Sequence, residues 1–168
     1  MDVRALFSLS YGLYIVSSVK DDRINAQIAN SAFQITSEPV RLAVSLNKQN
    51  LTHEYVESSG LFCVSILEKD VPMKFIGTFG FKSGRDIDKF DGVNHKILDG
   101  GVPAVVDHSL AYIAAKVVNK TDVGTHTIFI GEVFDADVIK SGEPMTYAYY
   151  HEVKKGKSPK AAPTYVKE

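Results

Sequence analysis

The sequence predicts a mainly β protein, folded as an antiparallel barrel or sandwich with a few short helices. Short apolar runs recur along the chain, several alternate between apolar and polar residues, and turn-forming residues separate them. The chain lacks the regular alternation of strands and long helices that a parallel sheet requires. It has 168 residues, of which 45% are hydrophobic and 23% charged. This size and composition are typical of one soluble domain.

The first strands are predicted from residue type and alternation. Residues 11–18 are rich in aromatic and β-branched side chains, which favour a strand. Residues 21–23 supply a polar turn. Residues 32–37 then alternate between apolar and polar side chains, and Pro39 ends that run because proline cannot donate a hydrogen bond to a sheet. Residues 40–46 alternate again and predict another strand.

Two short helices are expected in the middle of the chain. Asn50 can cap a helix that continues to about Ser58, and Gly60 stands where a helix commonly stops. Asp70 is the expected cap of a second helix, with Pro72 in its first turn, where a missing N–H group costs little.

The remaining elements are strands around one irregular segment. Residues 77–91 contain three glycines among mixed charges and are predicted to form an irregular loop. Gly131 is expected to mark a bulge or bend. The further strands are predicted at residues 61–67, 102–106, 110–118 and 127–138.

Composition and motif spacing exclude several classes of function. The net charge of −1 argues against nucleic-acid binding, and no apolar run approaches the roughly 20 residues that span a membrane. The five histidines are scattered without metal-ligand spacing, so no metal site is expected. Neither a Walker motif nor a Rossmann glycine motif is present. Cys63 is the single cysteine, which is compatible with a reducing cytoplasm; we interpret it as a buried core residue and not a reactive thiol.

Two segments remain as candidates for ligand binding. Residues 45–52 run from a strand end into a helix start, where free N–H groups and the helix dipole attract anions. The alternative is an ordinary polar loop with a helix cap. Residues 25–31 are small or carry amides, and they form either the lining of a site for a flat polar ligand or a loose strand edge. The pattern alone leaves both alternatives open.

Several motifs in a fixed order resemble the flavin reductase-like family, over about residues 5–160 of the chain. The resemblance is closest to an archaeal ferric reductase and to the flavin reductase domain of high-molecular-weight rubredoxins. The segments that carry it are residues 25–33, 37–39, 44–52, 57–60, 123–133, 147–151 and 154–159.

The resemblance implies an FMN-binding split β-barrel, an antiparallel Greek key that works as a homodimer. It implies hydride transfer from NADH or NADPH to flavin, with electrons then passed to free flavin, a ferric chelate or a rubredoxin-type protein. One alternative is an FMN-carrying electron-transfer protein of the flavoredoxin kind, reduced by a protein partner. A split barrel that holds heme, pyridoxal phosphate or coenzyme F420 is a third possibility, which the order of the motifs disfavours.

The family's binding residues can be carried over to matching positions, although no residue is assigned a certain catalytic role. His126 and Tyr150 match the nicotinamide side of the flavin, where the alternatives are a structural histidine and a tyrosine at the dimer interface. Tyr147 has the same alternatives as Tyr150. Many relatives have an aspartate where this chain has Thr125, which could change how His126 is oriented. The flavin-binding set is Gln27, Ile28, Ala29, Asn30, Ser31, Ser45, Leu46, Asn47, Lys48, Thr52, Lys82 and Arg85.

We therefore expect residues 1–150 to form the FMN-binding domain and residues 151–168 a basic C-terminal extension, which packs outside the barrel or begins a linker. No rubredoxin cysteines follow that extension. Any iron–sulfur partner is accordingly expected to be a separate protein, and the chain to be a cytoplasmic enzyme.

Overall fold

A computed structural model of the chain describes residues 1–165, without the side chains of Val3, Arg4 and Phe7. The last three residues of the predicted extension lie outside the described part. Within residues 1–165, seven antiparallel strands form one sheet in the order β2-β1-β5-β8-β9-β4-β3. Their bounds are β1 Tyr14–Lys20, β2 Arg23–Ala29, β3 Ala32–Ser37, β4 Val40–Asn47, β5 Leu61–Leu67, β8 Ser109–Asp122 and β9 His126–Val138. A small second sheet pairs β6 His95–Ile97 with β7 Pro103–Val105.

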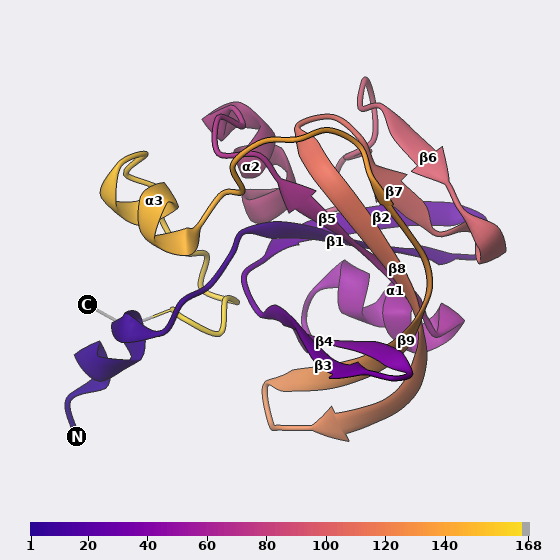
Figure 1. Ribbon diagram of the computed structural model, residues 1–168, viewed down its shortest axis with the longest axis horizontal. Coiled ribbons are helices and arrows are strands. Elements are labelled where there is room, and N and C mark those ends of the chain that lie inside the picture. Colours follow the sequence, from indigo (N-terminus) through magenta and orange to yellow (C-terminus); the bar gives the residue numbers. More distant parts are fainter. Residues whose placement is uncertain (166–168) are drawn as a thin grey trace.

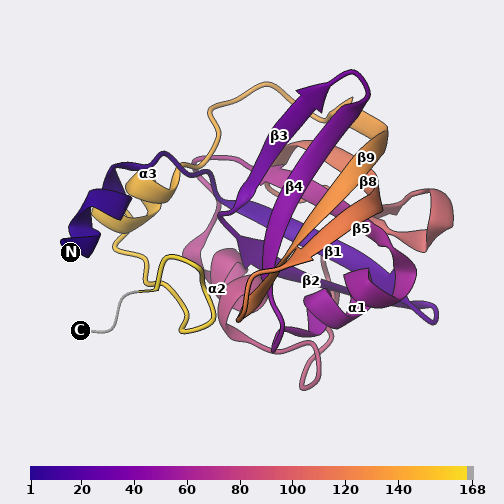
Figure 2. The same cartoon turned by 90° about the horizontal axis from the view of Figure 1, so that it is seen from below.

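The sheet closes on itself because its two edge strands follow each other in the sequence. β2 and β3 stand at opposite edges of the sheet, yet only Asn30 and Ser31 separate them along the chain. The sheet must therefore curl until these edges approach each other. The Ser31 carbonyl oxygen accepts a hydrogen bond of 3.0 Å from the N–H of Ser45, which extends the pairing of β3 with β4 back to the end of β2. Figures 1 and 2 show the resulting curved sheet from two sides. The predicted antiparallel split barrel is confirmed.

Helical segments surround the barrel. They are η1 Val3–Ser8, α1 Leu51–Ser59, α2 Met73–Phe81, η2 Asp99–Gly101 and α3 Tyr147–Glu152. α1 packs against β1 and β2, while η1 and α3 lie together on one side of the barrel in both views (Figures 1 and 2). Gly60 ends α1 with a positive φ of 68°, as predicted.

The second helix differs from its prediction at both ends. α2 begins at Met73 with Pro72 as its N-cap, and no side chain caps it, so Asp70 is not the cap. The helix also includes residues 77–81, which were expected in an irregular loop. A glycine inside a helix costs about 1 kcal/mol. Burial of Ile76 and Phe79 on one face of α2 offsets that cost here.

Two strands were not predicted as strands. Residues 23–29 form β2, which settles part of the open alternative for residues 25–31: they belong to an edge strand. β6 was missed because its three residues are all exposed, so they show no apolar pattern.

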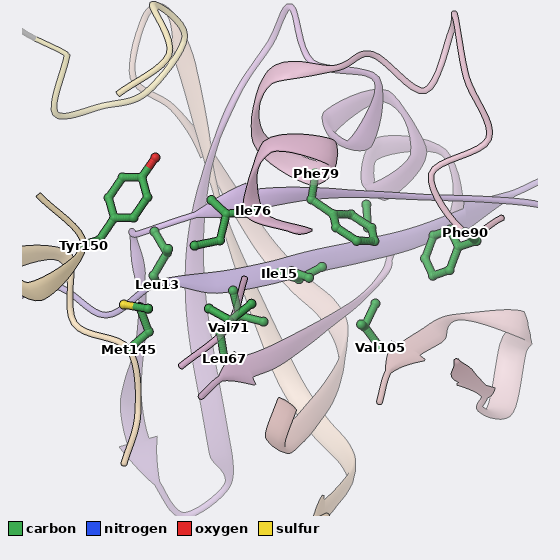
Figure 3. Close-up of a cluster of buried hydrophobic side chains, with 11 residues drawn as sticks. Leu13, Ile15, Leu67, Val71, Ile76, Phe79, Phe90, Val105, Met145 and Tyr150 are labelled. Atoms are coloured by element: carbon green, nitrogen blue, oxygen red, sulfur yellow. The ribbon is translucent and has the colours of Figure 1, made fainter. Parts of the chain in front are cut away.

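β1 is buried on both faces and separates two hydrophobic clusters. Val16 points into the barrel interior, together with Val44, Leu46, Val56, Phe62, Val64 and Phe129. The neighbouring Ile15 points the other way, into a cluster covered by α2 and α3. Figure 3 shows that second cluster, whose labelled members are Leu13, Ile15, Leu67, Val71, Ile76, Phe79, Phe90, Val105, Met145 and Tyr150.

Cys63 is a core residue, as predicted. It is completely buried on β5, beside Leu98, Val102 and Tyr112. Burial raises the pKa of its thiol to about 12. Because the thiolate is the reactive form, a thiol with this pKa is inert at neutral pH.

Gly131 marks a close approach of strands, and the irregularity lies in its neighbour. β9 pairs with β4 in continuous register through Gly131, whereas β8 has a register shift between Val117 and Asn119, opposite that position. A Cβ atom on Gly131 would lie 2.6 Å from the Phe62 ring and 2.7 Å from the Ala115 Cβ. Gly131 therefore does mark a bulge, as predicted, although the extra residue is in the paired strand β8, and packing against Phe62 and Ala115 requires a glycine here.

Candidate functional site

The main cavity has a volume of about 320 Å³, in the lower part of the range of about 300–1,000 Å³ that is common for ligand sites. Its walls come from β2, the end of β4, the start of α1, the end of α2 with the loop that follows, and α3 with the segment after it. Segments far apart in the sequence thus meet at one place, beside the edge of the barrel where β2 ends.

One end of the cavity is suited to an anion. The first turn of α1, including Leu51 and Thr52, lines the cavity, and no side chain caps that turn. Lys82 and Arg85 also line the cavity, and Arg85 lies beside the start of α1. Arg85 is held in place by hydrogen bonds from its guanidinium to the Gln49 carbonyl oxygen at 3.4 Å and to Glu54 Oε2 at 3.2 Å. An uncapped helix start beside two cations favours a negatively charged group.

The β2 wall offers amides to a polar ligand. Asn25 Nδ2 donates to Thr52 Oγ1 at 2.8 Å, which fixes β2 against the start of α1. Gln27 Oε1 is buried and has no hydrogen-bond partner among the described residues. Because a buried acceptor without a partner is costly, it indicates a missing donor. Gln27 lines the cavity, so a ligand N–H or O–H group can supply that donor.

A buried cation forms part of the wall. Lys89 is 5% exposed, and its ammonium donates to the carbonyl oxygens of Ala26 at 2.9 Å and Phe79 at 3.1 Å. Burial lowers the pKa of Lys89 to about 8. No carboxylate within residues 1–165 forms an ion pair with it.

The opposite end of the cavity is aromatic. Tyr150 is 3% exposed and donates from its hydroxyl to the Lys157 carbonyl oxygen at 3.0 Å. Burial raises the pKa of Tyr150. Its ring stacks on Tyr147 with centroids 6.3 Å apart, and Figure 3 shows it beside Leu13. This end is closed by the segment that follows α3, which contributes Lys157, Ser158, Pro159, Ala161, Ala162 and Pro163 to the lining.

A second pocket of about 410 Å³ adjoins the first and contains His126. His126 Nδ1 lies 2.8 Å from Thr125 Oγ1, so a neutral hydroxyl orients the ring. Its Nε2 is buried beside the Ala161 carbonyl in a geometry that forms no hydrogen bond. Burial lowers the pKa of His126, which favours the neutral ring.

Most of the predicted site residues line the main cavity. They are Gln27, Ile28, Ala29, Asn30, Ser45, Asn47, Thr52, Lys82, Arg85 and Tyr150. Ser31 lies next to the cavity and bonds to Asn30 Oδ1. Leu46 is buried in the barrel interior, Lys48 pairs with Asp122, and His126 is in the second pocket.

Asn25 and Gln49 also line the cavity and lie within the predicted segments 25–31 and 45–52, although neither was named as a binding residue. Sequence reasoning missed Phe79, Lys89 and six tail residues, which are Lys157, Ser158, Pro159, Ala161, Ala162 and Pro163. The lysine-rich, proline-containing tail gave no sign that it would return to the cavity.

The comparison with known families decides the identity of this fold and site. A family model described as the flavin reductase like domain matches residues 6–157. The chain belongs to the flavin reductase like family. The resemblance inferred from its motifs is therefore confirmed, and the protein is an oxidoreductase that uses flavin and NAD(P)H.

Two curated relatives match nearly the whole chain. It is 56% identical to the high molecular weight rubredoxin of Moorella thermoacetica over 165 residues, covering 98% of this chain and 72% of that protein. It is 54% identical to the ferric-chelate reductase (NAD(P)H) of Archaeoglobus fulgidus, covering 98% of both chains. Among solved structures, an NADH:FAD oxidoreductase of Streptomyces globisporus shares the fold, with a TM-score of 0.77 at 24% identity over 86% of this chain and 85% of that one.

Proposed function

We propose that this flavin reductase binds FMN in the main cavity, takes a hydride from NADH or NADPH, and passes electrons to a ferric chelate, free flavin or a rubredoxin-type protein. The observation that carries the proposal is the composition of the cavity. A cationic end built on an uncapped helix start lies in the same 320 Å³ space as an unpaired buried amide oxygen. FMN has the matching groups, a phosphate at one end and a flat ring with polar edges at the other.

The phosphate is assigned to the start of α1. Backbone N–H groups of the first helical turn, with Thr52 Oγ1, would donate to phosphate oxygens. Lys82 and Arg85 would add charge from the loop after α2. Arg85 is already oriented by Gln49 and Glu54, so binding would order little additional side chain.

The ring is assigned to the β2 wall. Gln27 Oε1 would accept a hydrogen bond from the polar edge of the ring, which satisfies a group that has no partner in the described chain. Ile28 and Ala29 line the cavity beside it, and Ala29 brings the backbone close because its side chain is small.

The nicotinamide is assigned to the side of His126 and Tyr150. Bound FMN would supply the redox chemistry, accepting a hydride and releasing electrons to the acceptor. The protein binds and orients the reactants. His126 stays neutral at neutral pH because burial lowers its pKa, and a neutral ring can donate or accept a hydrogen bond without repelling a cationic nicotinamide.

An anaerobic absorbance spectrum tests this function. The spectrum of purified protein loaded with FMN is recorded before and after addition of NADH, and then of NADPH. Bleaching of the flavin bands is the expected result, and the faster donor is the preferred one. Flavin bands that persist with both donors would contradict the reductase proposal and favour an electron carrier that a protein partner reduces.

We also propose that the protein is a cytoplasmic homodimer. Exposed apolar side chains occur on three successive strands of one half of the sheet, with Phe33 and Ile35 on β3, Val40 on β4 and Phe134 on β9. Such a surface is typical of a protein–protein contact. Sedimentation equilibrium checks the assembly, and a monomer at micromolar concentration would contradict it.

No helix in the described part of the chain is long and apolar enough to span a membrane.

A further inference from the structure

Residues 157–165, called the strap below, follow α3, contribute six residues to the lining of the main cavity and are held by side chains of the site itself. Tyr147 and Tyr150 bind the strap from α3: the Tyr147 hydroxyl lies 2.7 Å from Thr164 Oγ1, and the Tyr150 hydroxyl donates to Lys157. From the barrel, Asn30 Nδ2 donates to Thr164 Oγ1 at 2.9 Å. Asn47 Nδ2 donates to the Ala161 carbonyl oxygen at 3.2 Å.

The two asparagines are positioned to hold the strap. Asn30 is 5% exposed and Asn47 is 9% exposed, so each is fixed in the barrel wall. Both line the cavity, and both were expected to bind the cofactor. In the structure, an amide N–H of each is directed to the strap, and Asn30 Oδ1 also accepts from Ser31 Oγ at 3.0 Å.

The strap separates the two pockets. Ala162 and Pro163 line both the main cavity and the His126 pocket, as do Ser45 and Asn47 from β4. The two pockets therefore adjoin along the strap and the end of β4. Small and prolyl residues predominate between residues 159 and 163, so polar bonds hold the strap more than apolar burial does.

We propose that the strap is a wall of the flavin site that must open before flavin can enter or leave, and that Asn30 and Asn47 are positioning residues that hold it closed. The proposal rests on the proposed binding of FMN in the main cavity. The C-terminal segment would then control how long flavin stays bound. While the hydrogen bonds hold the strap closed, FMN remains bound as a cofactor. When the strap is open, FMN exchanges with solution as a substrate does.

A double-mutant cycle on the bond between Asn30 and Thr164 tests this directly. The rate of FMN release is measured by the return of flavin fluorescence after rapid dilution of loaded protein. Asn30→Ala removes one bond to the Thr164 hydroxyl, whereas Thr164→Val removes that bond together with the contact to Tyr147. Because one hydrogen bond contributes about 0.5–1.5 kcal/mol, Asn30→Ala should speed release by roughly threefold to tenfold, and Thr164→Val by at least as much. The double variant should release FMN no faster than Thr164→Val, because Thr164→Val already removes the bond to Asn30.

Two control variants distinguish loss of the hydrogen bond to the strap from a general loss of stability. Thr164→Ser keeps the hydroxyl and should release FMN at the rate of the unmodified protein. Thr78→Val removes a hydroxyl from α2 that bonds to the Lys74 carbonyl oxygen outside the cavity, and it should also leave the rate unchanged. If Thr164→Val does not change the rate, or if the effects of Asn30→Ala and Thr164→Val simply multiply, the strap proposal is wrong.

Limited trypsin digestion gives an independent readout. Lys157 and Lys160 are cleavage sites within the strap. FMN should slow cleavage after these lysines, and Thr164→Val should restore it. Equal cleavage with and without FMN would contradict the proposal. A protein whose flavin is bleached by NAD(P)H, but whose strap variants release FMN normally, refutes the strap alone. A protein that binds no FMN refutes the proposed function as well.

Discussion

The ammonium group of Lys89 donates a hydrogen bond to the carbonyl oxygen of Ala26 across 2.9 Å, and it also bonds to Phe79. One buried side chain therefore ties the edge strand β2 to the end of α2, the two elements that flank the main cavity. Because the ammonium is buried without a carboxylate partner in the described chain, its charge costs free energy that the two carbonyl bonds only partly offset.

That cost predicts an unusual dependence of stability on pH. Burial lowers the pKa of Lys89 from 10.5 to about 8, so between these values the unfolded chain binds more protons than the folded one. The free energy of unfolding should therefore rise with pH over this window, by at most about 3 kcal/mol. Urea denaturation of the unmodified protein and of Lys89→Met, from pH 7 to 10, measures the difference.

The difference between the two proteins isolates Lys89. Tyr14 and Tyr150 have pKa values raised by burial and oppose the trend at the alkaline end, but both are present in each protein and cancel. Lys116→Met, at an exposed position on β8, should follow the unmodified protein. A Lys89→Met variant whose stability tracks the unmodified protein across the window would contradict this assignment.

Arg85 should select for the phosphate of FMN. The guanidinium lines the cationic end of the cavity, so Arg85→Gln removes a charge-assisted contact. We expect the Kd for FMN to rise by about tenfold, a change of about 1.4 kcal/mol, while the Kd for riboflavin stays the same. Fluorescence titration with both ligands checks this. Arg41→Gln, whose guanidinium pairs with Glu132, is the matched control, and an equal loss for both ligands would move the phosphate elsewhere.

Two glycines should respond to alanine in opposite directions. Gly131→Ala places a Cβ atom against Phe62 and Ala115, and overpacking of this kind costs about 1–3 kcal/mol. Gly77 lies within α2, and no atom outside its own helix turn lies within 4 Å of the place that an alanine methyl group would take. Gly77→Ala should therefore stabilise the protein by about 1 kcal/mol through helix propensity. Thermal denaturation compares both; a stabilising Gly131→Ala would contradict the close-packing account.

The local sequence predicted an element correctly where a residue type or pattern is typical of one kind of structure. Gly60 predicted the end of α1, and the alternation of residues 40–46 predicted β4. The local sequence was not sufficient where a contact across the fold decides the outcome. Gly77 and Gly80 suggested a loop, but burial of Phe79 holds them in a helix. No local signal singled out Lys89, because only the tertiary structure brings the Ala26 and Phe79 carbonyls to it.

His126 should affect nicotinamide and not flavin. It lies in the second pocket, separated from the main cavity by the strap, so His126→Ala should keep FMN absorbance. The KM for the nicotinamide donor should rise by about tenfold, which corresponds to loss of one hydrogen bond of about 1.4 kcal/mol. Steady-state kinetics and a flavin titration measure the two effects. His95→Ala, outside both pockets, serves as the control, and loss of FMN from His126→Ala would place this histidine at the flavin.

Thr125, the neighbour of His126, should influence the pH at which the KM for the nicotinamide donor changes. Burial lowers the pKa of the ring, so the protonation step in the KM profile should fall below the ordinary histidine value of about 6.5. Thr125 Oγ1 contacts Nδ1 at 2.8 Å without adding charge. Thr125→Asp places a carboxylate there, which favours the imidazolium and should move the step to higher pH. Thr125→Asn, which is similar in size and neutral, should leave the step in place. A step that does not move in Thr125→Asp would mean that His126 is not the group that titrates.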